Sequence, residues 1–191
     1  YGGTGNDTLI GGAGADRLDG GSGNDVVDYS GSAAAVSVNL ATGVGSGGDA
    51  AGDTLVAITN VVGSGYADSL SGDTGNNLFY GGAGADDLDG GAGNDILYGG
   101  NDNDTLSGGA GNDYLAGGSG TDTVDYSAAG AAVNASLNSN SATGDGNDSF
   151  ASIENLTGSA YNDTLTGDSI DNVLTGNAGA DSLSGLAGND S

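Results

Sequence analysis

Single apolar residues recur every nine positions along most of the chain, and the stretches between them are rich in glycine, aspartate and asparagine. Each recurring residue is the middle member of a triplet such as Tyr-Leu-Ala at 114–116. Three residues suffice for one short β-strand whose central side chain faces a core while its neighbours face outward. The pattern therefore predicts buried side chains at Leu9, Leu18, Val27, Leu70, Phe79, Leu88, Leu97, Leu106, Leu115, Val124, Leu165, Leu174 and Leu183.

The six residues between successive triplets follow a second regular pattern. Fourteen copies of the unit begin with glycine, and position six is aspartate in twelve copies and asparagine in two (Asn77 and Asn172). Glycine at positions one, two and four allows positive φ and close backbone approach, which favours a tight turn whose carbonyl groups can point inward. Strands joined by such turns alternate between two sides, so one coil takes eighteen residues. We therefore expect an all-β fold, a right-handed parallel β-roll with two facing sheets.

Two segments interrupt the repeats and are copies of each other. The stretch VDYSGSAAAVSVNL, which leads into segment 29–62, corresponds to VDYSAAGAAVNASL, which leads into segment 126–157. Apolar residues alternate with polar ones at 36–40, which predicts a strand longer than those of the roll itself. We expect each segment to leave the roll, cover one of its edges and return, with Tyr29 and Tyr126 packed at the exit.

These interruptions divide the chain into five segments that we expect to form one continuous solenoid. The segments are array 1 (2–28), insert 1 (29–62), array 2 (63–125), insert 2 (126–157) and array 3 (158–191). Val61 and Leu156 lie nine residues before Leu70 and Leu165, so the roll should restart in phase after each insert. Both ends of the chain fall inside a repeat, and we expect it to be a piece of a longer protein. The insert acids Asp49, Asp53, Asp145 and Asp148 are interpreted as solvated loop residues in preference to a second site.

The charge and composition exclude several classes of function. The formal net charge is −25 with a single basic residue, Arg17, which argues against binding to nucleic acid or an anionic membrane. No apolar run is long enough to span a membrane. The chain has no cysteine and no histidine, so neither disulfides nor a nucleophile–base pair are available. We therefore expect no enzymatic activity in this chain, although its parent protein could be a secreted hydrolase or epimerase.

The column of acidic side chains requires a cation. Aspartates eighteen residues apart, such as Asp86 and Asp104, would stack ~4.8 Å apart with like charge. One buried aliphatic side chain per unit offsets only part of the entropy lost on ordering nine glycine-rich residues. The roll should therefore be disordered without metal. Calcium accepts six to eight carboxylate and carbonyl oxygens in flexible loops, whereas magnesium demands tighter geometry and zinc prefers histidine or cysteine.

The sequence thus predicts several calcium ions between successive coils. The expected carboxylate ligands are Asp7, Asp16, Asp25, Asp68, Asp86, Asp95, Asp104, Asp113, Asp122, Asp163, Asp181 and Asp190. The glycines expected to contribute to the calcium sites through the main-chain carbonyls of the turns are Gly82, Gly84, Gly91, Gly93, Gly100, Gly109, Gly111, Gly118 and Gly120. Sites that involve Asn77 or Asn172 should be weaker or empty, because the amide has no charge. Position four is not glycine at Tyr66, Asp102, Tyr161 and Ile170, where the turn should be altered.

The nonapeptides resemble those of the RTX (repeats-in-toxin) calcium-binding family. The inserts resemble the segment between roll coils in the C-terminal domain of serralysin-type metalloproteases, in the order D-Y-S, N-L, I-x-N and G-S-x-x-x-D. This resemblance implies calcium held by turn carbonyls and the repeat aspartates. It also implies export from a Gram-negative bacterium by type I secretion machinery and folding in extracellular calcium. The alternative is a repeat segment of a surface-layer, adhesin or extracellular filament protein that assembles with copies of itself.

Overall fold

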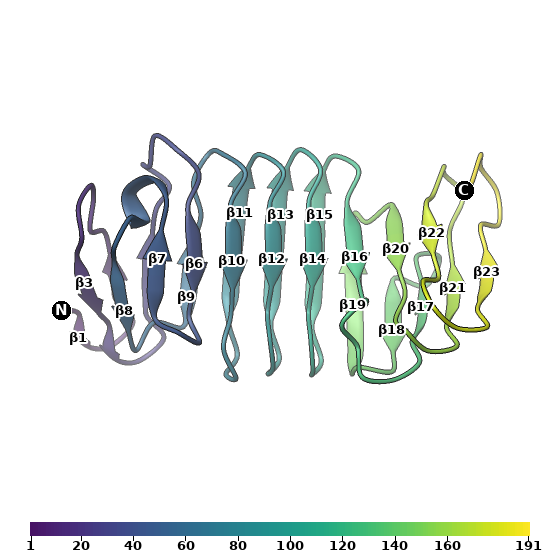
Figure 1. Ribbon diagram of the computed structural model, residues 1–191, viewed down its shortest axis with the longest axis horizontal. Coiled ribbons are helices and arrows are strands. Elements are labelled where there is room, and N and C mark those ends of the chain that lie inside the picture. The colour runs from purple at the N-terminus through teal and green to yellow at the C-terminus, as the bar shows by residue number, and fades with distance from the viewer.

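The computed structural model describes residues 1–191, and its strands stand side by side in a long stack with the two termini at opposite ends (Figure 1). Most strands belong to two sheets that face each other. Sheet I contains, in spatial order, β2 (Thr8–Leu9), β5 (Val26–Asp28), β9 (Asn60–Val62), β11 (Leu78–Ala83), β13 (Ile96–Asn101), β15 (Tyr114–Ser119), β19 (Asn147–Ala151), β18 (Ser141–Thr143), β17 (Asn134–Ser136), β21 (Thr164–Thr166) and β23 (Ser182–Ser184).

Sheet II lies opposite sheet I. It contains β22 (Leu174–Thr175), β20 (Asn155–Thr157), β16 (Thr123–Asp125), β14 (Thr105–Ser107), β12 (Asp87–Asp89), β10 (Ser69–Ser71), β6 (Ser37–Asn39), β7 (Val44–Ser46), β8 (Thr54–Val56) and β3 (Arg17–Asp19). The short strands β1 (Gly3–Thr4) and β4 (Gly21–Ser22) pair separately, and one 3-10 turn covers Gly48–Ala50. This three-residue turn is the only helical element, and it is far too short to span a membrane.

The strands alternate between the sheets with the expected eighteen-residue period. In sheet II, Leu70 pairs with Leu88 and Leu88 with Leu106, all in parallel register. In sheet I, Phe79 pairs with Leu97 in the same way. The prediction of a parallel β-roll with two short strands in each coil is therefore confirmed.

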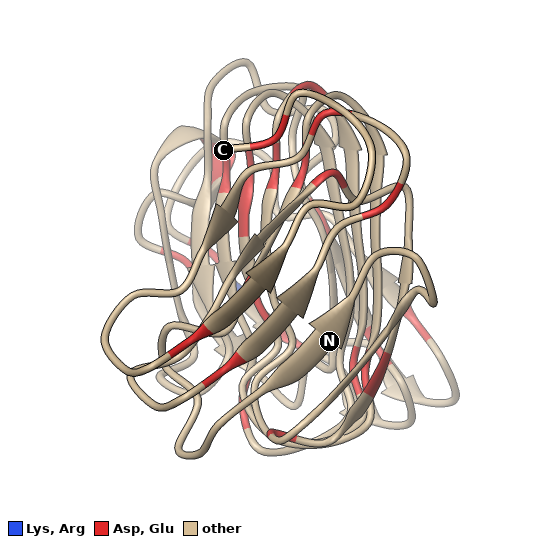
Figure 2. Ribbon diagram, turned by 90° about the vertical axis from the view of Figure 1, so that its right-hand side faces the viewer, with Lys and Arg blue, Asp and Glu red and all other residues tan.

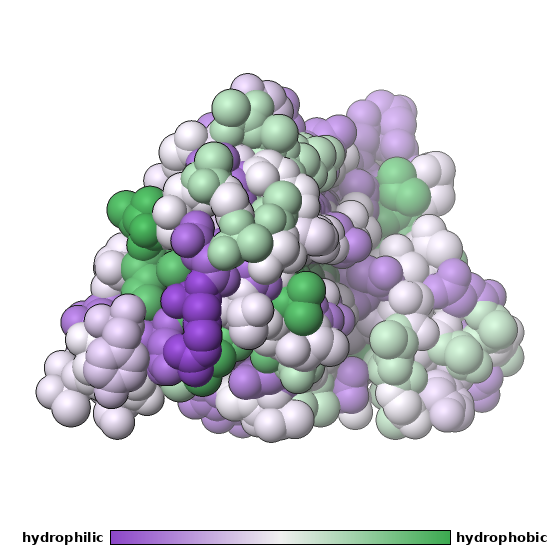
Figure 3. Space-filling model, turned by 60° about the vertical axis from the view of Figure 1, so that its left-hand side comes forward, coloured by the Kyte–Doolittle hydropathy of each residue, from purple (hydrophilic) through white to green (hydrophobic).

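The apolar column forms one core between the sheets. Twenty-eight buried apolar residues belong to a single cluster, and twelve of the thirteen predicted residues are among them. The exception is Leu183, which is 48% exposed. It lies on β23, the last strand of sheet I, where no further coil covers it. Large apolar side chains on the outside are scattered among polar ones, as Figure 3 shows for one face, so no broad apolar surface forms there.

The expectation that the inserts cover an edge of the roll is wrong. Insert 1 supplies β6, β7 and β8 to the interior of sheet II, where β7 runs antiparallel to both neighbours. Insert 2 supplies β17, β18 and β19 to sheet I in the same manner. An added antiparallel strand gives the longer connection backbone partners on both sides, so the sheet continues without a gap. The long strand expected at 36–40 is also wrong, because β6 covers only Ser37–Asn39 and matches three residues on each neighbour.

The rest of the insert prediction agrees with the structure. Tyr29 and Tyr126 are buried in the core. Val61 on β9 pairs with Phe79, and Leu156 on β20 pairs with Leu174, so the roll resumes in phase.

The two inserts lie in opposite sheets because of the number of repeats between them. Array 2, residues 63–125, holds seven nonapeptides, and each moves the chain to the other sheet. An odd number therefore brings the second insert to the face opposite the first.

Candidate metal sites at the two edges of the roll

The repeat aspartates line the two edges of the roll, where the turns enter the strands. Figure 2, which looks along the stack, shows acidic residues on the connections and near the ends of strands. Asp7, Asp25, Asp95, Asp113, Asp163 and Asp181 precede strands of sheet I, whereas Asp16, Asp68, Asp86, Asp104, Asp122 and Asp190 lie on the opposite edge. Most of these side chains are buried, but Asp190 is exposed at the end of its edge. The fold thus brings the predicted ligands into two columns.

A hydrogen bond between coils orients most of these carboxylates. The backbone N–H of Asp86 donates to Oδ1 of Asp104 at 2.9 Å, and that of Asp104 donates to Oδ1 of Asp122 at 2.8 Å. On the other edge, Asp95 donates to Asp113 at 2.8 Å. The same bond joins Asp7 to Asp25, Asp68 to Asp86 and Asp163 to Asp181. One oxygen of each accepting carboxylate is therefore fixed by the preceding coil.

The second carboxylate oxygen is buried and has no partner. This holds for Oδ2 of Asp7, Asp16, Asp25, Asp86, Asp95, Asp104, Asp113 and Asp122. A buried anionic oxygen without a partner is costly, and a nearby cation removes that cost. The donor set consequently fits a hard metal ion.

The glycines of the turn are required for two different reasons. The nine predicted turn glycines all have positive φ, for example 121° at Gly82 and 106° at Gly84. Asp102 takes the same left-handed conformation, with φ of 72°, so its turn keeps the regular shape. The glycine at position one has an ordinary φ, but there is no space for a side chain. A β-carbon on Gly81 would meet Asp86 Oδ2 and would lie 2.7 Å from the carbonyl oxygen of Gly99. Carboxylate and carbonyl oxygens of adjacent coils therefore border one narrow space.

Burial makes the carboxylates of array 2 hard to ionise in the absence of a cation. It raises the pKa of Asp86 and Asp95 to about 7 and that of Asp104 and Asp113 to about 6. The accepted backbone hydrogen bond lowers each pKa, but neighbouring carboxylates, such as Asp104 beside Asp86, raise it again. An ionised carboxylate on this folded edge would thus carry a charge that no basic side chain of array 2 neutralises.

No three acidic side chains converge on one point. A cation between two coils would take carboxylate oxygens from successive aspartates and complete its shell with main-chain carbonyls. This mixture of hard oxygens suits calcium, whereas zinc would favour nitrogen or sulfur ligands.

Four turns have a different geometry, and we call them the closed turns: 63–68, 72–77, 158–163 and 167–172. In the first, the backbone N–H of Ser64 donates to Oδ2 of Asp68, and its hydroxyl donates to Oδ1 at 2.7 Å. Ser159 does the same for Asp163. Both aspartates were expected to be ligands, but both of their oxygens have protein partners. Serine at position two is the sequence signal that reveals this difference.

The other two closed turns end in asparagine. Oδ1 of Asn77 accepts from the N–H of Asp73 at 3.0 Å, and Oδ1 of Asn172 accepts from Asp168 at 2.8 Å. None of the four closed turns contains a residue with positive φ. The remaining ten turns, which we call open turns, all have position two in the left-handed region. Of the four turns without glycine at position four, the three with Tyr66, Tyr161 and Ile170 are closed.

The interpretation of all four insert acids as solvated is wrong for two of them. Asp53 and Asp148 are buried, and their Oδ2 atoms accept 2.8 Å hydrogen bonds from the hydroxyls of Tyr29 and Tyr126. Burial, the hydrogen bond to tyrosine and the close negative charge raise the pKa of both tyrosines. Each tyrosine is the first residue of its insert and pairs with an aspartate 24 or 22 residues later, so the pairing depends on the fold of the segment between them.

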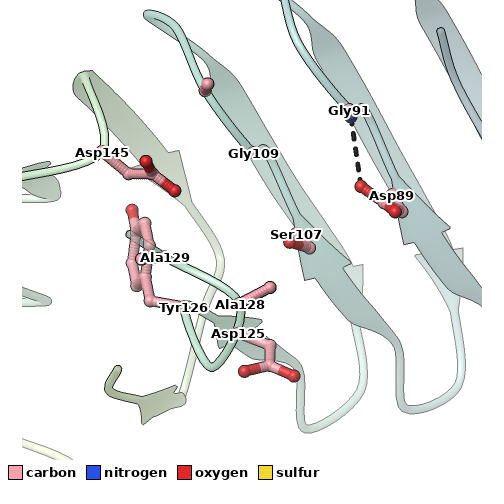
Figure 4. A pocket seen from close by; sticks show the side chains of 10 residues that line it. Asp89, Gly91, Ser107, Gly109, Asp125, Tyr126, Ala128, Ala129 and Asp145 are labelled. Carbon is pink, nitrogen blue, oxygen red and sulfur yellow. Dashed lines mark hydrogen bonds between the residues drawn. The ribbon is translucent and has the colours of Figure 1, made fainter. Parts of the chain in front are cut away.

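One cavity of about 330 Å³ opens where insert 2 leaves sheet II. Asp89 accepts a 3.1 Å hydrogen bond from the N–H of Gly91. Figure 4 shows that Asp89 lies at a distance from Tyr126 and Asp145. The polar side chains that line the cavity are three carboxylates, the hydroxyl of Ser107 and the hydroxyl of Tyr126. These groups form no arrangement of a nucleophile beside a base.

A comparison with protein families matches the model of the RTX calcium-binding nonapeptide repeat in four copies, at residues 1–31, 62–97, 89–124 and 157–191. Together these matches cover more than half of the chain. A search of curated proteins found no match.

Proposed function

Because the chain belongs to the family of RTX calcium-binding nonapeptide repeats, we propose that it is the calcium-dependent folding module of a secreted bacterial protein. The observation that carries this proposal is the column of buried aspartate Oδ2 atoms without partners. Calcium, when bound, supplies the positive charge that allows these carboxylates to remain ionised inside the roll.

The chain's own residues prepare the sites. The hydrogen bond between successive coils fixes Oδ1, leaves Oδ2 available and sets the distance between neighbouring turns. Left-handed glycines at positions two and four bend the backbone so that its carbonyls can approach the same space. The apolar column then gains its full burial only when adjacent coils stack, which couples binding to folding.

This coupling accounts for the compartment that we propose. Extracellular calcium modules bind with dissociation constants of roughly 10⁻⁴–10⁻³ M, well above the calcium level of a cytosol. The repeats that depend on calcium would then stay unfolded before export, which suits passage through a type I secretion channel, and would order outside the cell. The strong net charge of −25 supports the same order of events, since it opposes collapse without a counterion.

Calorimetric titration of the whole chain with calcium, and separately with magnesium, tests this function. We expect several calcium ions to bind with dissociation constants of roughly 10⁻⁴–10⁻³ M, together with a gain of β-structure, and magnesium to bind much more weakly. Absence of calcium binding, or equal binding of magnesium, would refute the proposal.

A further inference from the structure

The four closed turns occur as two consecutive pairs, and each pair directly follows an insert. Turns 63–68 and 72–77 come after insert 1, and turns 158–163 and 167–172 come after insert 2. All other turns of the roll are open. The difference in geometry is therefore organised along the chain.

In the first turn of each pair, protein donors satisfy the whole carboxylate. Oδ1 of Asp68 accepts from the Ser64 hydroxyl at 2.7 Å and from the N–H of Val36 at 2.7 Å, and Oδ2 accepts from the N–H of Ser64. The hydroxyl of Ser64 in turn accepts a hydrogen bond from the N–H of Tyr66 at 3.2 Å. The second copy repeats these contacts.

In that copy, Asp163 accepts from Ser159 and from the N–H of Val133 at 2.8 Å, and Tyr161 donates to the Ser159 hydroxyl at 3.0 Å. Three protein donors thus bind a buried carboxylate at the same place in both halves of the chain, and a tyrosine N–H holds the serine hydroxyl among them.

In the second turn of each pair, a neutral amide replaces the carboxylate. Nδ2 of Asn77 donates to the carbonyl oxygen of Thr59 at 2.9 Å, and Nδ2 of Asn172 donates to that of Glu154 at 2.8 Å. The amide therefore bridges two coils directly, with an N–H···O bond at the position where open turns present carboxylate oxygens. No charge remains to be neutralised there.

The inserts satisfy their own buried acids as well. Asp53 accepts from the Tyr29 hydroxyl and from the N–H of Asp16, both at 2.8 Å. Asp148 accepts from the Tyr126 hydroxyl at 2.8 Å and from the N–H of Asp113 at 3.1 Å. An insert and its two closed turns thus contain no aspartate with an unpartnered buried oxygen, unlike the open turns.

These same segments hold a dense part of the core. In the first copy, Tyr29, Val36, Val38, Val61, Leu70 and Phe79 are almost completely buried. The antiparallel strands of each insert also make their backbone hydrogen bonds over short loops, which lowers the entropy cost of forming them. Both copies therefore combine strands that pair over short loops, buried apolar side chains and buried acids whose oxygens all accept hydrogen bonds.

We propose that residues 29–77 and 126–172 are calcium-independent folding nuclei, and that calcium binds only between neighbouring open turns. The ions would lie between the turns that end at Asp7 and Asp25, Asp86 and Asp104, Asp104 and Asp122, and Asp95 and Asp113. Asp68 and Asp163 would bind no calcium. This inference rests on the proposed function, because it separates the repeats that fold with calcium from the segments that fold first and against which those repeats then stack.

Hydrogen–deuterium exchange of the whole chain, resolved by peptides, tests the nuclei in chelator and in millimolar calcium. In chelator we expect amides within 29–77 and 126–172 to exchange slower than random coil by roughly tenfold or more, while 2–28 and 81–122 exchange freely. In calcium, the arrays should become protected as well.

A matched pair of variants separates the closed turns from a general loss of structure. Ser64→Ala with Ser159→Ala removes the two capping hydroxyls and should reduce protection of the nuclei in chelator by about tenfold. Ser22→Ala with Ser119→Ala removes exposed serines of open turns that make no side-chain hydrogen bond, and should leave protection unchanged. Both variants should be fully protected in calcium, which shows that they fold.

The outcomes distinguish the two proposals. If no segment is protected in chelator but calcium protects all of them, the nuclei do not exist while the calcium function stands. If the Ser64 and Ser159 variant keeps its protection in chelator, the serine caps are not what stabilises the nuclei. If calcium changes exchange nowhere, the proposed function fails.

Discussion

The backbone N–H of Asp86 donates a 2.9 Å hydrogen bond to Oδ1 of Asp104, one coil further along, while Oδ2 of both residues is buried without a partner. The first contact aligns the two carboxylates before any metal is present. The unpartnered Oδ2 of each residue is an oxygen for which the fold supplies no hydrogen-bond donor. The two aspartates are thus arranged for a cation and pay an energetic penalty without one.

An interior aspartate should matter more for calcium than one at the end of its edge. Asp104 has open turns on both sides, whereas Asp190 is exposed and its neighbour is the closed turn that ends in Asn172. We expect Asp104→Asn to remove up to two calcium ions from the stoichiometry measured by calorimetric titration. Asp190→Asn should remove none, and equal losses from the two variants would contradict the assignment.

The close approach at position one predicts a strong effect of adding a single methyl group. In Gly81→Ala the new β-carbon would collide with Asp86 Oδ2 and the carbonyl of Gly99. We expect the free energy of unfolding by urea in calcium to fall by about 1–3 kcal/mol. Gly31→Ala is the control, because its β-carbon would have no heavy atom within 4 Å. A loss of similar size in both variants would show that the turn is not packed as described.

Acid should partly replace calcium. The pKa of Asp86 and Asp95 is raised to about 7 in the folded chain, compared with about 3.9 for an unfolded aspartate. The folded chain then binds more protons between these values, so its stability without metal is greatest near pH 4 and is lost as the pH rises toward 7. Circular dichroism of the chain, freed of calcium on a chelating resin, should therefore show more β-structure at pH 4 than at pH 7.

The matched control for this pH dependence replaces Asp86, Asp95, Asp104 and Asp113 by asparagine. Asparagine cannot ionise, so the variant should show a much smaller change in β-structure between pH 4 and pH 7. A pH dependence as large as that of the unaltered chain would assign the effect to other acids.

Opening a closed turn should create a calcium site. Ser64→Gly combined with Tyr66→Gly removes the serine cap of Asp68 and restores glycine at positions two and four, beside the open turn 81–86. We expect native mass spectrometry in calcium to detect one additional bound ion. Ser64→Ala removes the hydroxyl without supplying the glycines and should add none. An unchanged count in the double variant would mean that the serine cap does not exclude calcium.

The repeating part of the fold could be predicted because each unit encodes its own geometry. One apolar residue in nine fixes the side facing the core, and the turn glycines fix the bend, so twelve of thirteen core positions were correct. Leu183 failed because burial in a stack depends on the next coil, which no residue in its own unit encodes.

The inserts were harder to predict because their contacts join distant residues. Alternation at 36–40 indicates a strand but not its direction, and β7 comprises only Val-Gly-Ser, a weak strand signal. The pairing of Tyr29 with Asp53 spans 24 residues, so neither residue alone indicates that the acid is buried. The closed turns that end in aspartate differ in sequence from the open turns by serine at position two, Ser64 and Ser159. The sequence alone does not show that this hydroxyl donates to the carboxylate at position six.

The most direct measurement is a calcium titration of the whole chain at neutral pH, followed by far-UV circular dichroism and begun in chelator. We expect a limited β-signal in chelator from the two nuclei, followed by a sigmoidal increase with a midpoint of roughly 10⁻⁴–10⁻³ M as the open turns bind calcium. Magnesium at the same concentrations should produce little change. A complete β-spectrum in chelator that calcium does not alter would contradict the claim that calcium folds the open arrays.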